Sequence, residues 1–159
     1  MTRRPGGLPP TARPLGGRLV IAGCSRRKRA SNVPVAALEL YEGGSIPWLR
    51  ARLGSCPRLR RRVRILSAEH GLLEADSPLL PYDRLLDAGR ARQLAAAVTA
   101  ALTRDWAVGG APGEVLVIAE PLYLVPLAAL LATQARVHWI PDPRDTAQAA
   151  RVLDQWGWP

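Results

Sequence analysis

The chain of 159 residues contains no phenylalanine, a single lysine at Lys28, and only two cysteines, Cys24 and Cys56. Two cysteines without a C-x-x-C pair do not build a disulfide framework or a structural zinc site. No apolar run is long enough to span a membrane, and the N-terminus lacks the apolar core of a signal peptide. These absences predict a soluble, cytoplasmic protein without a metal or other cofactor, and without a membrane partner.

Positive charge is what the chain has in excess, because 22 lysine and arginine residues outnumber 13 acidic ones and give a formal net charge of +9. This balance favours an anionic partner, which could be nucleic acid, a nucleotide or phosphate. A genome rich in G and C would also replace lysine and phenylalanine by arginine and alanine, and this bias accounts for part of the excess. Charge alone therefore leaves open whether the partner is a polymer or a small anion.

The length predicts one domain with a core of its own. Residues 1–17 are rich in proline, glycine and arginine without any apolar period, which predicts a disordered basic tail. Residues 18–159 then form the single domain.

Short aliphatic runs alternate with helical patterns along that domain. Strands are predicted at 18–22, 62–66, 114–119 and 136–140, and helices at 34–41, 46–53, 87–102, 124–132 and 146–156. Strands joined by helices imply parallel pairing with helices on both faces of the sheet. The predicted fold is an α/β three-layer sandwich with a mainly parallel, four-stranded sheet.

Each predicted strand ends in polar residues: Cys24 and Ser25, Ser67 and His70, Glu120, and Asp142. The carboxyl ends of parallel strands lie along one edge of a sheet, where α/β proteins bind ligands in a crevice. We therefore expect these residues to converge on a functional site.

The segment Gly23-Cys24-Ser25-x-x-Lys28 lies where a phosphate-binding turn would be. Glycine lets the backbone approach a ligand, hydroxyl and amide donors bind oxyanions, and Arg27 or Lys28 adds charge. The segment is neither a Walker A motif nor a dinucleotide fingerprint, and an ordinary turn with solvated basic residues is the alternative. Cys24 is a candidate nucleophile only beside a base, and a packed cysteine is the more frequent case.

Glu69, His70 and Asp83 are the candidate catalytic residues near the central strand. A carboxylate could activate water or stabilise the oxocarbenium-like transition state of glycosidic-bond cleavage, and an imidazole could act near neutral pH. A surface charge at Glu69 and a helix cap at Asp83 are the structural alternatives. Tyr41 and Tyr82 could stack on a planar base, whereas His138, inside a strand, is expected to be structural.

Four segments occur in an order that resembles a known family: Gly23-Cys24-Ser25-x-x-Lys28, Leu40-Tyr41-x-Gly43, Ile65-Leu66-Ser67-Ala68-x-His70-Gly71-Leu72-Leu73, and Pro81-Tyr82-Asp83. Together they resemble a bacterial family related to the YaaA peroxide-stress proteins. They are also similar, more distantly, to the domain of archaeosine synthase and related 7-deazaguanine enzymes that is likened to uracil-DNA glycosylase. The resemblance covers residues 19–87 and implies an α/β fold and a link to nucleobases, nucleotides or nucleic acid.

The leading hypothesis is an enzyme that hydrolyses or transfers at the N-glycosidic bond of a nucleotide or nucleoside, with a nucleobase-containing small molecule as partner. Its predicted substrate-binding residues are Gly23, Cys24, Ser25, Arg27, Lys28, Tyr41, Ser67, Gly71, Tyr82 and Glu120. The alternative is a non-catalytic nucleic-acid-binding or stress-response protein of the YaaA-related type. A third hypothesis is an accessory domain that docks through Trp156 and Trp158, unless these tryptophans fold back onto the domain.

Overall fold

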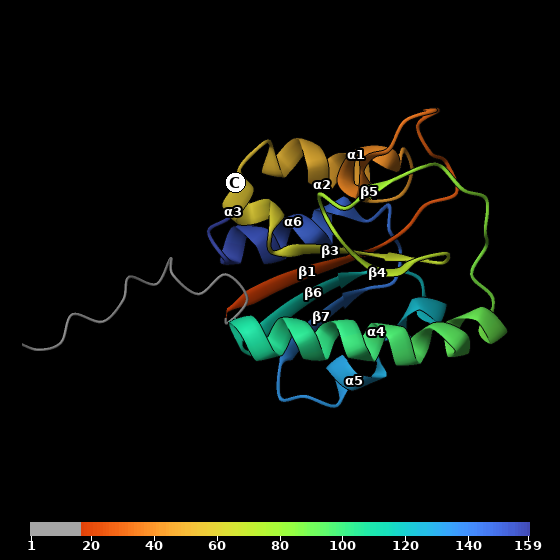
Figure 1. The fold of residues 1–159 in the computed structure, drawn as a ribbon. Coiled ribbons are helices and arrows are strands. Elements are labelled where there is room, and N and C mark those ends of the chain that lie inside the picture. The colour runs from red at the N-terminus through yellow and green to blue at the C-terminus, as the bar shows by residue number, and fades with distance from the viewer. Residues whose placement is uncertain (1–16) are drawn as a thin grey trace, which may run out of the picture.

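The computed structural model describes residues 17–159, and its centre is one β-sheet of five strands (Figure 1). The strands are β1 (Arg18–Gly23), β3 (Val63–Ser67), β4 (Gly71–Glu74), β6 (Glu114–Ile118) and β7 (Arg136–Ile140). They lie in the order β4-β3-β1-β6-β7, and neighbouring strands are parallel except for β3 and β4. The predicted α/β fold with a mainly parallel sheet is confirmed, with five strands where the sequence predicted four.

The additional strand, β4, follows β3 through a tight turn. Ser67 pairs with Gly71, so β4 runs back antiparallel to β3. Gly71 has a φ of 75°, a left-handed conformation that is strained for residues with a Cβ. The turn before Gly71 therefore opens a hairpin, where the sequence predicted strands joined by helices.

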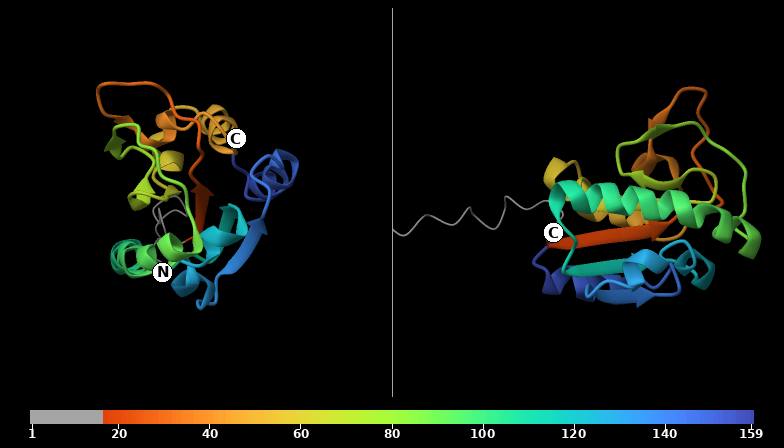
Figure 2. Two further views of the ribbon diagram at one scale, coloured as in Figure 1. Left: turned by 90° about the vertical axis from the view of Figure 1, so that its right-hand side faces the viewer. Right: turned by 60° about the horizontal axis from the view of Figure 1, so that its bottom comes forward.

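Helices cover both faces of the sheet and give the predicted three layers (Figures 1 and 2). One face carries α1 (Ala37–Leu40), α2 (Ile46–Leu53), α3 (Pro57–Arg60) and α6 (Thr146–Gln155). The other carries α4 (Ala88–Gly109), the 3-10 helix η2 (Pro121–Leu124) and α5 (Ala128–Leu131). Val20 of β1 joins the core of the first face and Ile21 that of the second, because successive side chains point to opposite sides.

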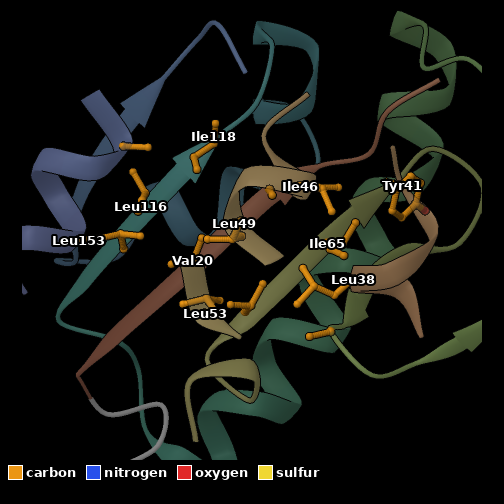
Figure 3. Close-up of a cluster of buried hydrophobic side chains, with 14 of the residues drawn as sticks. Val20, Leu38, Tyr41, Ile46, Leu49, Leu53, Ile65, Leu116, Ile118 and Leu153 are labelled. Carbon is orange, nitrogen blue, oxygen red and sulfur yellow. The ribbon is translucent and has the colours of Figure 1, made fainter. Parts of the chain in front are cut away.

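The core of the first face is shown in Figure 3, where Leu49 and Leu53 of α2 pack with Val20 and Ile65 of the sheet. All four side chains are buried, and burial of such a side chain stabilises the fold by about 1.5 to 3 kcal/mol. This packing holds α2 against the sheet. It thereby also fixes the glycine turn that precedes the helix.

Two predicted helices, α2 and α6, have nearly the observed bounds. The start predicted for α4 is also found, because Asp87 Oδ1 accepts a hydrogen bond of 2.7 Å from the Arg90 N–H, but the helix runs on to Gly109 instead of ending at residue 102. The prediction of one helix over 34–41 was wrong, because β2 (Val35–Ala36) pairs there with β5 (Pro78–Leu79) and leaves α1 a single turn. The helix predicted over 124–132 is also interrupted, because Pro126 disfavours a helical interior, and only α5 remains of it as an α-helix.

The C-terminal tryptophans fold back onto the domain. Trp156 and Trp158 are 6% and 8% exposed and pack against each other in the core of the first face. The proposal of a tryptophan docking surface was therefore wrong.

The predicted basic tail, residues 1–17, lies outside the described residues except for Gly17. Among the helices of residues 17–159, none combines the length and the apolar character needed to cross a membrane.

Candidate functional site

A cleft of about 500 Å³ lies at the carboxyl ends of β1, β6 and β7. Cys24 follows β1, Glu120 follows β6 and Asp142 follows β7, and all three residues line the cleft. The three strands are parallel neighbours, so their ends meet at one edge of the sheet. The convergence of strand ends that the sequence predicted is found for these three strands.

One wall of the cleft is polar and comes from the α2 side of the sheet. It consists of the turn after β1 and the glycine turn before α2. Ser25 Oγ donates to the Arg27 carbonyl at 2.8 Å and accepts from the Gly43 N–H at 3.1 Å, which joins the two turns. A Cβ at Gly43 would lie only 3.2 Å from the Ser25 Cβ, so this close approach favours glycine. Gly44 has a φ of 64°.

Three arginines line the cleft: Arg26, Arg27 and Arg144. Within residues 17–159, the guanidinium groups of Arg26 and Arg27 make no ion pair or hydrogen bond. Arg144, in contrast, donates through its backbone N–H (2.9 Å) and its Nε (3.2 Å) to Asp142 Oδ1. These bonds, the backbone bond first, lower the pKa of the exposed Asp142 carboxyl. Two of the arginines that line the cleft therefore have guanidinium groups that are unpaired within the described residues.

The opposite wall is apolar and comes from the α4 side of the sheet. Leu86 and Tyr123 pack against the core of that face, and Leu85 and Leu122 complete the wall. Leu85 is 62% exposed and Leu122 is 39% exposed, so both present apolar surface to solvent at the cleft. An apolar surface that borders a cleft is typical of ligand sites.

The floor of the cleft contains a thiol beside a phenol. Cys24 Sγ lies 3.2 Å from the Tyr123 hydroxyl and accepts from the Ala68 N–H at 3.4 Å. The Tyr123 ring lies against Gly23, where a Cβ would be 3.5 Å from two ring carbons. Desolvation raises the pKa of Tyr123, and the neighbouring Cys24 adds to this effect. Tyr123 therefore stays a neutral hydrogen-bond donor at physiological pH.

A second polar cluster lies beside the cleft without lining it. The Tyr82 hydroxyl is 2.6 Å from both the Tyr41 hydroxyl and Ser67 Oγ. Desolvation raises the pKa of Tyr41 to about 12 and raises that of Tyr82 further. The His70 ring meets the Tyr82 ring edge to face at 5.2 Å between centroids. Lys28 Nζ lies over the Tyr82 ring, 4.4 Å from its centroid.

The predicted site residues fall into three groups. The cleft itself is lined by Gly23, Cys24, Ser25, Arg27 and Glu120. The neighbouring cluster contains Lys28, Tyr41, Ser67, His70 and Tyr82. Outside both lie Glu69, Gly71 and Asp83.

Several predicted contacts differ from the observed ones. Tyr41 is completely buried, so it cannot stack on a base as the sequence suggested. Gly71 faces Leu94 and Val98 of α4, where it serves the hairpin turn. Glu69 forms an exposed ion pair with Arg84 at 3.2 Å, the surface charge that was the alternative for this residue.

Asp83 is exposed and precedes α4 by several residues, so it does not cap that helix. The structural role expected for His138 is confirmed, because its Nε2 lies 3.0 Å from Glu114 Oε2.

Sequence reasoning missed most of the residues that form the walls. Gly44, Leu85, Leu122, Tyr123 and Arg144 line the cleft but were not among the predicted site residues. Tyr123 lies three residues after the predicted strand end at Glu120, and this proximity was the signal that could have identified it. The two leucines carried no such signal, because the sequence does not distinguish them from core residues.

A mainly parallel sheet with helices on both faces defines the chain as an α/β protein, and its cleft lies at the strand ends, where open-sheet proteins bind their ligands. Residues 19–143 match the model of a family described as "Family of unknown function (DUF6884)", and the chain belongs to this family. Searches of curated proteins and of solved structures found no match. The family match extends well beyond residue 87 and contains no reference to YaaA proteins or glycosylases.

Proposed function

We propose that the protein binds a nucleotide in the cleft and cleaves its N-glycosidic bond. The observation that carries this proposal is the chemical difference between the two walls, one cationic and rich in glycine, the other apolar. A molecule with an anionic end and a planar, weakly polar end fits such a cleft. The volume of about 500 Å³ lies within the range of roughly 300–1,000 Å³ that is usual for small-molecule sites.

The polar wall would bind the phosphate group. The guanidinium groups of Arg26 and Arg27 have no partner among the described residues, and Arg144 lines the same cleft. Guanidinium groups match phosphate oxygens in geometry and charge. Gly43 and Gly44 belong to the same wall, where the chain packs closely against Ser25 and Pro143.

The apolar wall would hold the base. Leu85 and Leu122 are exposed at the cleft, and Tyr123, whose ring lies against Gly23, also lines it. A base placed there would cover apolar surface that is otherwise in contact with water. The sequence segments that resemble YaaA proteins and the uracil-DNA-glycosylase-like domain add support for a nucleobase.

Glu120 is the carboxylate best placed for the reaction. It lines the cleft at the end of β6 and, within residues 17–159, its side chain has no ion-pair or hydrogen-bond partner. In the proposed step, Glu120 accepts a proton from water while the water oxygen bonds to the anomeric carbon of the sugar. The bond to the base nitrogen breaks, the leaving base takes up a proton from solvent, and Glu120 then releases its proton to solvent. Sugar phosphate and free base are the products.

Incubation with a panel of nucleosides and nucleoside 5′-monophosphates tests the proposal. Free base is separated by chromatography, and binding is measured by calorimetry. We expect base release from at least one monophosphate, and tighter binding of that monophosphate than of its nucleoside. Neither release nor binding with any member of the panel would refute the proposal.

A non-catalytic nucleic-acid-binding protein is the second candidate, and one observation favours it. Arg26, Arg27 and Arg29 are all exposed on the same turn. A polymer bound there would release counterions, so its affinity would fall steeply with salt concentration. An affinity for single-stranded DNA or RNA that does not change with salt would exclude this candidate.

A further inference from the structure

Lys28 lies beside the cleft but does not line it, although it belongs to the basic turn. We infer that Lys28 and Tyr82 are positioning residues that hold the turn with Arg26 and Arg27 in the conformation that receives an anionic ligand. This inference rests on the proposed function, because it assigns a role to the turn that binds the phosphate.

The Lys28 ammonium group is bound to its own turn. Its Nζ donates to the Ser25 carbonyl at 3.1 Å and to the Arg26 carbonyl at 3.3 Å. These two carbonyl groups precede and follow the Arg26 Cα, so the ammonium group contacts the backbone on both sides of the Arg26 side chain. Lys28 thus folds back and fixes the backbone from which the free guanidinium groups extend.

Tyr82 supplies the surface on which the ammonium group rests. Lys28 Nζ lies 4.4 Å from the centroid of the Tyr82 ring and 5.8 Å from that of Tyr41, distances at which a cation is attracted to an aromatic ring. The Tyr82 ring is held in place, because its hydroxyl is hydrogen-bonded to Ser67 Oγ and to the Tyr41 hydroxyl. Both phenols are neutral at physiological pH, so they hold the ammonium group without cancelling its charge.

Backbone contacts connect the same turn to the segment before α2. The Arg29 N–H donates to the Leu40 carbonyl at 2.7 Å, and the Glu42 N–H donates to the Arg27 carbonyl at 2.9 Å. Gly43 N–H donates to Ser25 Oγ. If Lys28 and Tyr82 hold the turn, these three amide hydrogens should exchange faster when Lys28 or Tyr82 is replaced.

Three variants separate the contributions. K28M keeps the length of the side chain and removes the ammonium group, whereas Y82L keeps Lys28 and removes the ring beneath it. Y82F is the matched control, because it retains the ring and removes only the hydroxyl. Thermal unfolding confirms that each variant is folded, and K28R should restore the behaviour of the wild type in part.

Hydrogen exchange gives a readout that needs no ligand. We expect exchange at Arg29, Glu42 and Gly43 to become about tenfold faster in K28M and Y82L, the effect of losing one cation–π contact or charged hydrogen bond. Y82F should change it much less. Unchanged exchange in both K28M and Y82L would overturn the inference.

Binding of adenosine 5′-monophosphate and adenosine, or of the pair that the panel identifies, tests the consequence for the ligand. We expect K28M and Y82L each to weaken binding of the monophosphate about tenfold and to leave the nucleoside unaffected. If Lys28 contacts phosphate directly, Y82L will not have this selective effect, and the inference is wrong. Faster exchange combined with no ligand binding by the wild type would instead leave the positioning role intact and refute the proposed function.

Discussion

Two glutamates at opposite ends of strand β6 have contrasting environments. Glu114 begins the strand, and its Oε2 is 3.0 Å from both His138 Nε2 and Trp156 Nε1. Glu120 follows the strand, lines the cleft and has no side-chain partner within residues 17–159. One carboxylate is used to attach the C-terminal helix to the sheet, while the other remains available for a ligand or for water.

The same contrast holds for the arginines. Arg18 donates to the Trp156 carbonyl at 3.0 Å and lies over the Trp156 ring, and Arg64 is buried in an ion pair with Asp105 at 3.1 Å. Arg26 and Arg27 have no such partners among the described residues. Charged groups that the fold satisfies are structural, and those that it leaves unsatisfied at a cleft mark the candidate site.

The largest effect is expected for E120Q. If Glu120 activates water, this variant should lose about 100-fold or more of the turnover, as is typical for a general base, without a change in thermal stability. Turnover is followed by the release of free base. D83N should keep its activity because Asp83 lies outside the cleft. The reverse result, with D83N inactive and E120Q active, would favour the carboxylate that the sequence suggested.

For E114A we expect the opposite pattern. The substitution leaves the Trp156 indole N–H without its acceptor, so the free energy of unfolding should fall by about 1 to 3 kcal/mol. Denaturation in urea measures this loss, and the affinity for nucleotide should not change. A folded protein of normal stability would show that this contact does not hold the C-terminal helix.

R27A tests the cationic wall of the cleft. Loss of one charged hydrogen-bond donor should weaken binding of a nucleoside monophosphate about tenfold. R29A is the matched control, because Arg29 is exposed on the same turn but does not line the cleft. Calorimetry measures both variants. Equal losses would indicate a diffuse electrostatic effect, as expected for a polymer-binding surface.

Alkaline titration should distinguish the three tyrosines from free tyrosine. Burial raises the pKa of Tyr41 to about 12 and raises those of Tyr82 and Tyr123 as well. The folded protein therefore holds these protons more tightly than the unfolded chain does. The stabilisation that these three phenols contribute is fully present below about pH 10 and is lost as the pH rises toward 12 and above. Phenolate absorbance should consequently appear together with unfolding, and phenolate formation in the folded protein near pH 10 would contradict this.

The smallest effect concerns acid stability. Hydrogen bonds from Trp156 and His138, in that order, lower the pKa of Glu114. The unfolded chain binds this proton more readily, so the stabilisation is present above the ordinary pKa of glutamate and is lost as the pH falls through the lowered value. Unfolding measured across this acidic range should depend slightly less on pH in E114Q than in the wild type. Identical pH profiles would show that the bonds to Glu114 contribute no measurable acid sensitivity.

Local pattern was sufficient to predict most of the sheet and its longer helices. Val20, Ile65 and Leu116 belong to apolar runs short enough for strands, and Asp87 is followed by an apolar period of helical spacing. β4 was missed because its short sequence after Gly71 is equally compatible with a loop. The helix expected from residue 34 was lost because Val35 pairs with Leu79, which is distant in the sequence.

For the candidate site, the sequence by itself determined which residues end the strands, because a parallel sheet places Cys24, Glu120 and Asp142 at one edge. Only the tertiary structure decided which side chains face the cleft. Tyr41 and Lys28 are polar residues in the same region of sequence as Arg27, yet packing buries Tyr41 and turns Lys28 back onto its own loop. Leu85 and Tyr123 join the cleft through the packing of α4 and η2 against the sheet. Local sequence fixes backbone propensity, whereas the orientation and exposure of a side chain depend on neighbours that are far away along the chain.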